Sequence, residues 1–233
     1  PVVDGIVLQE PPLDAIRTGL SRDVPLLVGS NRDEWKLFAA MDPRLQKLDE
    51  AGLLARVELR VPGGDPERAR ALIEGYRRSG EARVGTTPLD LFCALETDRV
   101  YRIPALDLAD AQLAAGASVH SYLFTRPSAL LGGALGACHA AEIPFVFGNV
   151  RSAAGRAFAG SGPDVERLEA QIVEAWSGFA RSGAPGASGL PDWRPYTLER
   201  RETMTLGATC ALELDPGSAT RRLWAGFPAR AAS

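Results

Sequence analysis

Two segments with the pattern of strands, each followed by a loop of polar or small residues, constrain the fold of this chain most strongly. The first is the apolar run 26–28, which ends in the polar turn 29–33. The second is the segment 118–125, in which three ring side chains at alternate positions would share one face of a strand: His120, Tyr122 and Phe124. Because the carboxyl ends of parallel strands meet at one edge of a sheet, we expect the residues after the two segments to lie close together.

Most of the remaining chain has helical spacing. Helices are expected in four parts of it: 45–60, 69–76, 89–115 and 163–183. Within the third of these, Pro104 is expected to kink the helix or to restart it. Two short strands and a last amphipathic turn are predicted to follow: 202–206, 210–214 and 221–227.

Composition excludes several classes of function. The 26 basic and 29 acidic residues give a net charge of −3 without a long run of one sign, which argues against nucleic acid as a partner. Three cysteines at wide spacing, Cys93, Cys138 and Cys210, indicate neither a disulfide framework nor a metal site. We therefore expect no metal and no organic cofactor. A reducing, cytoplasmic location is the simplest expectation, and no signal-peptide pattern follows Pro1.

The segment 128–148 is long enough for a bilayer and consists mostly of apolar or small residues. A histidine, an acid and a proline within it, His139, Glu142 and Pro144, argue against a membrane span. Its three glycines favour a loop that lies close to other backbone. We expect no transmembrane segment here.

Two candidate catalytic residues follow the two strand-like segments. Glu34 comes after the first and His139 after the second, with Asp33 as a rival for the acid. A serine hydroxyl becomes a good nucleophile when an imidazole takes its proton and a carboxylate orients that imidazole. The order acid, then histidine, is that of α/β hydrolases, in which the serine precedes both. No Gly-x-Ser-x-Gly pentapeptide occurs in residues 1–233, and the nearest match, 186–190, ends in leucine. The expected nucleophile therefore lies outside this chain.

The segments that contain Glu34 and His139, 24–34 and 136–148, resemble motifs of the type-B carboxylesterase family. This family includes cholinesterases and p-nitrobenzyl esterases. Further segments follow the order and rough spacing of that family: 1–5, 11–12, 97–98, 104–105, 174–183, 190–193 and 203–205. The resemblance implies an α/β protein, the C-terminal portion of an α/β-hydrolase fold with a mainly parallel sheet flanked by helices. It also implies that residues 1–233 are the C-terminal part of a single domain whose serine-bearing N-terminal half is absent.

The implied function is hydrolysis of carboxylic esters through an acyl-serine intermediate, with Glu34 as the acid and His139 as the base. By the same resemblance Phe38 lines the substrate pocket, although an aromatic residue in an apolar patch is also typical of a core. Glu142 is expected either to form hydrogen bonds behind the catalytic pair or to be an ordinary surface acid. The expected partners are a small-molecule ester and the N-terminal half of the same protein.

Two other functions compete with the hydrolase hypothesis. One is a non-catalytic, cholinesterase-like binding or adhesion protein, and the other is an independent binding module. The presence of both Glu34 and His139 favours the hydrolase. The only other histidine, His120, is expected to pack within a strand, and Cys138 is badly placed to share a proton with its neighbour. The family commonly has glycine where this chain has Trp35 and Ala140.

Overall fold

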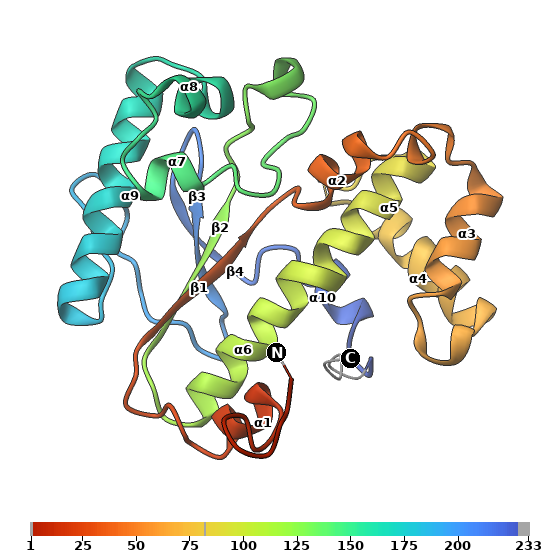
Figure 1. The fold of residues 1–233 in the computed structure, drawn as a ribbon, viewed down its shortest axis with the longest axis horizontal. Coiled ribbons are helices and arrows are strands. Elements are labelled where there is room, and N and C mark those ends of the chain that lie inside the picture. Colours follow the sequence, from red (N-terminus) through yellow and green to blue (C-terminus); the bar gives the residue numbers. More distant parts are fainter. Residues whose placement is uncertain (1, 82, 228–233) are drawn as a thin grey trace.

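The computed structural model describes residues 2–81 and 83–227. Its centre is a four-stranded sheet in the order β1-β2-β3-β4, with bounds Leu26–Asn31, Val119–Phe124, Glu202–Leu206 and Ala211–Leu214 (Figure 1). The pairings β1–β2 and β2–β3 are parallel and only β3–β4 is antiparallel. The predicted α/β class with a mainly parallel sheet is confirmed.

The register of the first two strands brings their carboxyl ends together. Asn31 at the end of β1 lies opposite Phe124 at the end of β2. The contact continues beyond the strands, because Arg32 N donates to Phe124 O at 2.9 Å. The two loops that carry the candidate residues therefore start side by side, as the sequence predicts.

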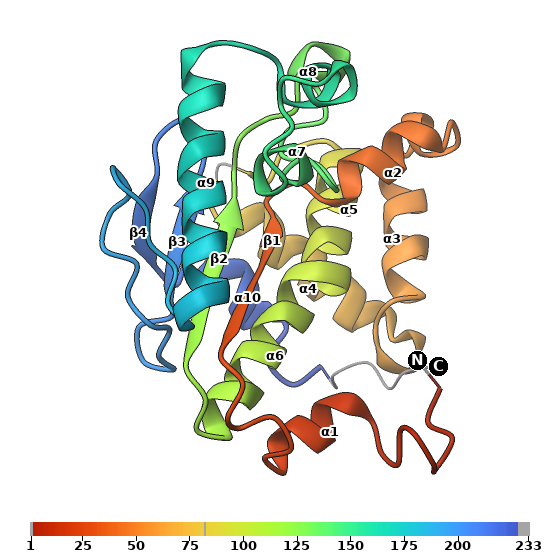
Figure 2. The same ribbon diagram turned by 60° about the vertical axis from the view of Figure 1, so that its left-hand side comes forward.

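Helices cover both faces of the sheet because the strand side chains alternate. Leu26 and Val28 of β1 point to the core formed with α6 (Ile103–Ala114). The opposite face packs on α9 (Pro163–Ser182), which runs beside the strands in Figure 2. On that face three ring side chains of β2 lie together, and the prediction that they share one face is confirmed: His120, Tyr122 and Phe124.

The helix α9 shows how the sequence sets the bounds of an element. Pro163 occupies its first turn, where a missing N–H costs nothing, and Asp164 and Glu166 add negative charge near the positive end of the helix. The helix ends at Gly183, whose φ of +75° is left-handed, a conformation that glycine adopts without strain. The predicted helix 163–183 is therefore confirmed at both ends.

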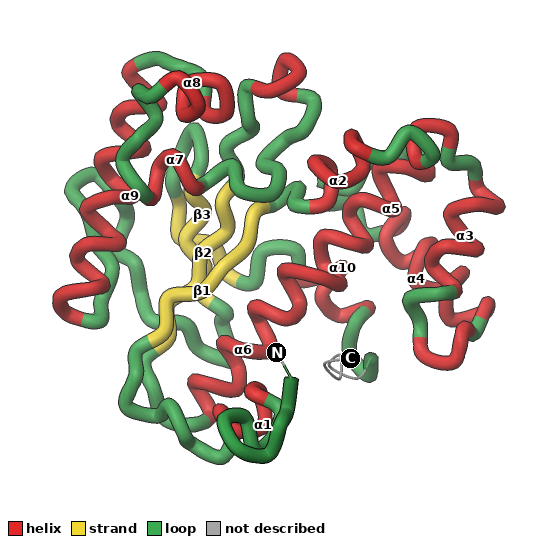
Figure 3. Tube along the Cα trace, in the orientation of Figure 1, coloured by secondary structure: helices red, strands yellow, loops and turns green. Residues whose placement is uncertain are grey.

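A second group of helices lies beside the sheet (Figure 3). It contains α2 (Trp35–Met41), α3 (Glu50–Glu58), α4 (Pro66–Arg78) and α5 (Pro88–Thr97), with short 3-10 turns at Leu45–Lys47 and Pro62–Gly64. These helices enclose a separate apolar core around Tyr76 and Phe92. The spacing of apolar residues in the sequence predicts α3, α4 and α5, whereas the short helix α2 was not predicted.

The run from 88 to 114 is helical throughout but changes its geometry in the middle. A π-helical turn, Asp98–Arg102, joins α5 to α6, and Pro104 lies in the first turn of α6. Proline lacks the N–H that an α-helix would use, and a wider turn just before it accommodates this loss. The sequence predicts a kink or a restart at Pro104, and α6 does begin there, directly after a π-helical turn.

The remaining helices are short and mostly lie in the segments that connect the longer elements. They are α1 (Pro12–Arg17), α7 (Ile143–Val146), α8 (Ala153–Ala159) and α10 (Ser218–Leu223), with a 3-10 turn at Leu130–Gly133. None of the helices in the described part of the chain combines the length and the apolar character needed to cross a bilayer. The predicted turn at 221–227 overlaps the end of α10.

Candidate active site

Glu34 lies between β1 and α2 with its side chain directed into the protein. Its Oε1 accepts a hydrogen bond of 2.8 Å from the backbone N–H of Asn31, and the side chain is only 6% exposed. Burial raises the pKa of Glu34 above its ordinary value, and the hydrogen bonds from Asn31 and His139 oppose this rise. The carboxylate is therefore held in one orientation by the fold.

His139 lies in the loop between β2 and α7 and contacts Glu34 directly. Its Nδ1 is 2.7 Å from Glu34 Oε2, and its backbone N–H donates to Glu34 O at 3.3 Å. The side chain is 42% exposed, so the ring reaches the surface while its Nδ1 edge is fixed. The structure thus brings together the two residues that the sequence singled out, although they are 105 positions apart.

Asp33, the rival acid, binds the histidine loop rather than the imidazole. Its backbone N–H donates to Ala137 O, and its Oδ2 accepts from Ala137 N, both at 2.9 Å. Its carboxylate also pairs with Arg32 and Lys36 at 3.1 and 3.2 Å. Gly136 is needed beside it, since a Cβ there would lie 2.4 Å from Asp33 Oδ2. Asp33 therefore braces the loop two residues before His139.

Glu142 contacts the pair through Asn31. Asn31 Nδ2 donates to Cys138 O at 2.8 Å and also to Glu142 Oε2. The same asparagine holds Glu34 by its backbone N–H, so one residue joins the acid strand to the histidine loop. Asn31 was not predicted from the sequence, because an amide in a polar turn gives no sign of its distant partners.

Aromatic rings surround the imidazole. The ring centroids of Phe38 and Tyr101 lie 5.2 and 5.1 Å from that of His139, and Trp35 packs on Phe38 at 5.0 Å. Phe38 comes from α2 and Tyr101 from the π-helical turn, so two separate elements form this wall. Phe38 thus lies at the site, while its role in substrate binding stays a prediction. Tyr101 was missed, because helical spacing alone does not show what a side chain faces.

Cys138 points away from the site. Its side chain is buried in the core on the α9 face of the sheet, and burial raises its pKa to about 11. A thiol in that environment stays protonated at neutral pH and is a poor nucleophile. The exclusion of a cysteine–histidine pair by local geometry agrees with the structure.

Comparison with known proteins now identifies the family. Residues 1–223 match the model of the Carboxylesterase family. The chain belongs to the carboxylesterase family. The resemblance found in the sequence is thereby confirmed over nearly the whole chain.

Three relatives show how much of a carboxylesterase this chain spans. It is 31% identical to the para-nitrobenzyl esterase of Bacillus subtilis over 226 residues, which are 95% of this chain and 42% of that protein. It is 29% identical to the phenmedipham hydrolase of Pseudarthrobacter oxydans, covering 89% of this chain and 40% of the relative. The crystal structure of the Geobacillus stearothermophilus carboxylesterase EST55 at pH 6.2 superposes with a TM-score of 0.82 and 36% identity, over 96% of this chain and 45% of the other.

The structural match confirms the predicted α/β-hydrolase fold. The chain spans less than half the length of these relatives. It therefore contains only part of what a full-length carboxylesterase of this kind contains.

One departure of this chain from its family has a structural cost. Ala140, directly after His139, has a φ of +66°, a left-handed conformation that costs a residue with a Cβ about 1–2 kcal/mol. Trp35, the other departure, is not among the described residues with positive φ, so glycine is not required there. Of these two departures, only the one after the histidine has a left-handed backbone conformation.

The substitution Ala140→Gly is expected to stabilise the protein. Relief of the left-handed strain outweighs the greater entropy of glycine in the unfolded chain, leaving a gain of about 0.5–1 kcal/mol. Urea unfolding would measure it, with Ala141→Gly as the matched control. Ala141 is buried in a turn without positive φ, so that control should lose about 1 kcal/mol through the greater freedom of glycine in the unfolded chain. A loss of stability in Ala140→Gly would contradict the interpretation.

Proposed function

We propose that this chain supplies the acid and the base of a carboxylic ester hydrolase whose nucleophilic serine lies in a preceding half outside the 233 residues. The single observation that carries the proposal is the 2.7 Å contact between His139 Nδ1 and the buried Glu34 Oε2, beside a ring that reaches the surface. An imidazole held at Nδ1 by a carboxylate is oriented to exchange protons at Nε2. In the described part of the chain, Nε2 has no hydrogen-bond partner.

The proposed reaction has two stages. His139 Nε2 takes the proton of the serine hydroxyl as the serine oxygen attacks the ester carbonyl, and then gives that proton to the departing alcohol oxygen. The resulting acyl-serine is attacked by water, whose proton again passes to His139 and then to the serine oxygen as the carboxylic acid leaves. Glu34 keeps the proton of the neutral imidazole on Nδ1 and stabilises the imidazolium formed in each stage.

The residues around the pair have proposed supporting roles. Phe38 would contact the substrate, because its ring packs against the imidazole at which the ester group must react. Glu142 would act on the pair only through Asn31, the residue that it contacts. A small-molecule ester is thus the proposed substrate, bound partly by this chain and partly by its missing half.

The N-terminal half of the same protein is the proposed partner of β1. Among the described strands, β1 pairs only with β2 and leaves one edge open. The segment ahead of it exposes several large apolar side chains: Val2, Ile6, Val7 and Leu20. An open strand edge beside exposed apolar residues favours association with another part of a sheet. On this proposal residues 1–233 are the C-terminal part of a single α/β-hydrolase domain.

The non-catalytic, cholinesterase-like alternative is not favoured. The relatives carry the names of esterases, a hydrolase and a lipase, and the acid and histidine are both in place. No motif or feature of the described residues supports an independent binding module.

The test is hydrolysis of p-nitrophenyl acetate by the chain alone and by the chain joined to the serine-bearing half of a related carboxylesterase. The chain alone is expected to show no activity above that of its His139→Ala variant, whereas the completed protein should hydrolyse the ester. Activity of the chain alone that disappears in His139→Ala would reveal a nucleophile within these residues. A completed protein that folds but does not hydrolyse esters would contradict the proposed function.

A further inference from the structure

A buried arginine behind the site lacks the hydrogen bonds that such a group normally makes. Arg102 ends the π-helical turn, and its side chain is only 9% exposed. Among the described residues its one ion pair is long, 3.8 Å to Asp98 Oδ1, and its guanidinium donates no hydrogen bond to any of them. The planar guanidinium carries five N–H donors, so it can bind an added acceptor such as a carboxylate.

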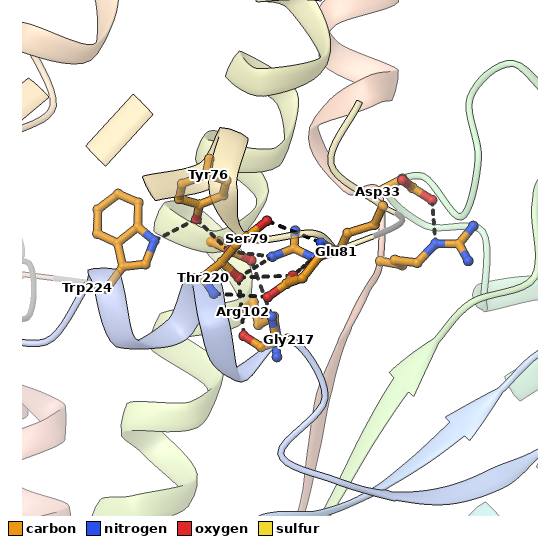
Figure 4. A network of polar contacts seen from close by, with 11 residues as sticks. Asp33, Tyr76, Ser79, Glu81, Arg102, Gly217, Thr220 and Trp224 are labelled. Atoms are coloured by element: carbon orange, nitrogen blue, oxygen red, sulfur yellow. Dashed lines mark hydrogen bonds and ion pairs between the residues drawn. The ribbon is translucent and has the colours of Figure 1, made fainter. Parts of the chain in front are cut away.

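The guanidinium of the neighbouring arginine, in contrast, makes several hydrogen bonds. Arg83 donates to Asp98 at 2.6 Å, to Glu81 at 3.0 Å and to Thr220 at 2.7 Å. Figure 4 shows this polar network, which extends through Tyr76 to Trp224. Arg83 therefore uses Asp98 Oδ2, whereas Asp98 Oδ1 accepts no hydrogen bond and lies 3.8 Å from Arg102 Nη1.

The guanidinium of Arg102 borders a cavity of about 200 Å³. Its lining has charged groups on one part and an apolar part formed by Leu123 and Pro216: Arg32, Glu81, Arg83, Arg102, Leu123, Pro216 and Gly217. Neither Glu34 nor His139 lines it, so this cavity is separate from the candidate catalytic pair.

Gly217 allows Arg102 to lie at the cavity wall. It has a φ of +69°, and a Cβ at this position would lie 2.2 Å from Arg102 Nη1. Any larger residue would displace the guanidinium. The absence of a side chain at Gly217 therefore leaves the space in which the planar guanidinium of Arg102 lies against the cavity.

The charges around the cavity select the ligand. Asp98 and Glu81 balance Arg83 and Arg102, and Arg32 is paired with Asp33. A dianion would add two uncompensated negative charges to this poorly solvated cluster, whereas a monoanion adds one. A carboxylate also matches the two parallel N–H donors of a guanidinium, and a short alkyl chain suits the apolar lining.

We propose that this cavity binds a short-chain carboxylate, with its two oxygens on Arg102 and its alkyl group against Leu123 and Pro216. The proposal does not depend on the proposed hydrolase function. Two sources can supply such a carboxylate group: a free carboxylate, or an Asp or Glu side chain of the missing half.

The test is calorimetric titration of the chain with sodium butyrate at constant ionic strength, and with sodium sulfate as a dianion. Saturable butyrate binding with a Kd on the order of millimolar is expected, with much weaker sulfate binding. Arg102→Met should weaken butyrate binding at least tenfold. Leu123→Trp should do the same by filling the cavity while leaving every charge in place, which guards against a folding defect in the arginine variant. The exposed Arg151→Met is the matched control and should bind as the parent does.

Three results would overturn the proposal: no saturable butyrate binding, binding that survives both cavity variants, or sulfate binding that is equally tight. A repeat with the chain joined to a serine-bearing half distinguishes the two sources. Binding to both forms supports a free carboxylate as the ligand. Binding to the chain alone supports the site and indicates that an acidic side chain of the other half occupies it.

Discussion

If the chain joined to a serine-bearing half hydrolyses esters as proposed, replacing His139 by glutamine is expected to lower its kcat for p-nitrophenyl acetate by roughly 10⁴- to 10⁶-fold with little change in KM. Glutamine keeps a polar side chain of similar size but cannot accept and return a proton at neutral pH. The substrate would still bind, because binding does not need the proton transfer. Steady-state kinetics of the purified variant would measure both parameters.

The matched control is the same substitution at the only other histidine. His120 is buried in β2 against Phe179, and burial lowers its pKa, so it is held neutral within the core. His120→Gln is expected to retain kcat within about twofold, even if it lowers the melting temperature. A similar loss of activity in both variants would mean that folding, not proton transfer, explains the result. More than a tenth of the activity left in His139→Gln would contradict the proposed role of His139 as the base.

The part of the site that depends on chain order and strand ends was predictable from the sequence. Glu34 and His139 each follow a strand, and parallel strands bring such positions to one edge. Their contact is thus a consequence of topology, which the pattern of apolar runs predicts. The helix 163–183 was predictable for a similar reason, since its apolar spacing and both of its end signals are local.

The supporting contacts could not be predicted, because they depend on where distant segments meet. Asn31 bonds to the backbone of Cys138, more than one hundred residues away in the chain. Tyr101 reaches the imidazole because a π-helical turn changes the direction of side chains in a run that has ordinary helical spacing. The short helix α2, which positions Phe38, has too few residues to show a helical period by itself.

By the same proposal, the substitution Glu34→Gln is expected to lower kcat of the completed protein by about 10⁴-fold while the protein remains folded. The glutamine oxygen can still accept from Asn31 N, but its amide donates toward His139 Nδ1. The imidazole then carries its proton on Nε2, where it must instead accept one from the serine. Asp33→Asn is the matched control: its carboxylate braces Ala137 and does not contact the imidazole, so that variant should lose stability more than kcat.

The stability of Glu34→Gln should change in the opposite direction to its activity. Because burial raises the folded-state pKa of Glu34, the carboxylate ionises more readily in the unfolded chain. The stabilising contribution of the protonated form is therefore present below the unfolded pKa and is lost as the pH rises through the folded value. At neutral pH, glutamine avoids this loss, so the variant should melt at the same temperature as the parent or higher.

Thermal melts at pH 7 and near pH 4 would test this expectation, and an advantage of the variant at pH 7 should shrink at the lower pH. A variant that is inactive and also much less stable at pH 7 would show that Glu34 mainly supports the fold, and the proposed catalytic acid would have to be sought elsewhere.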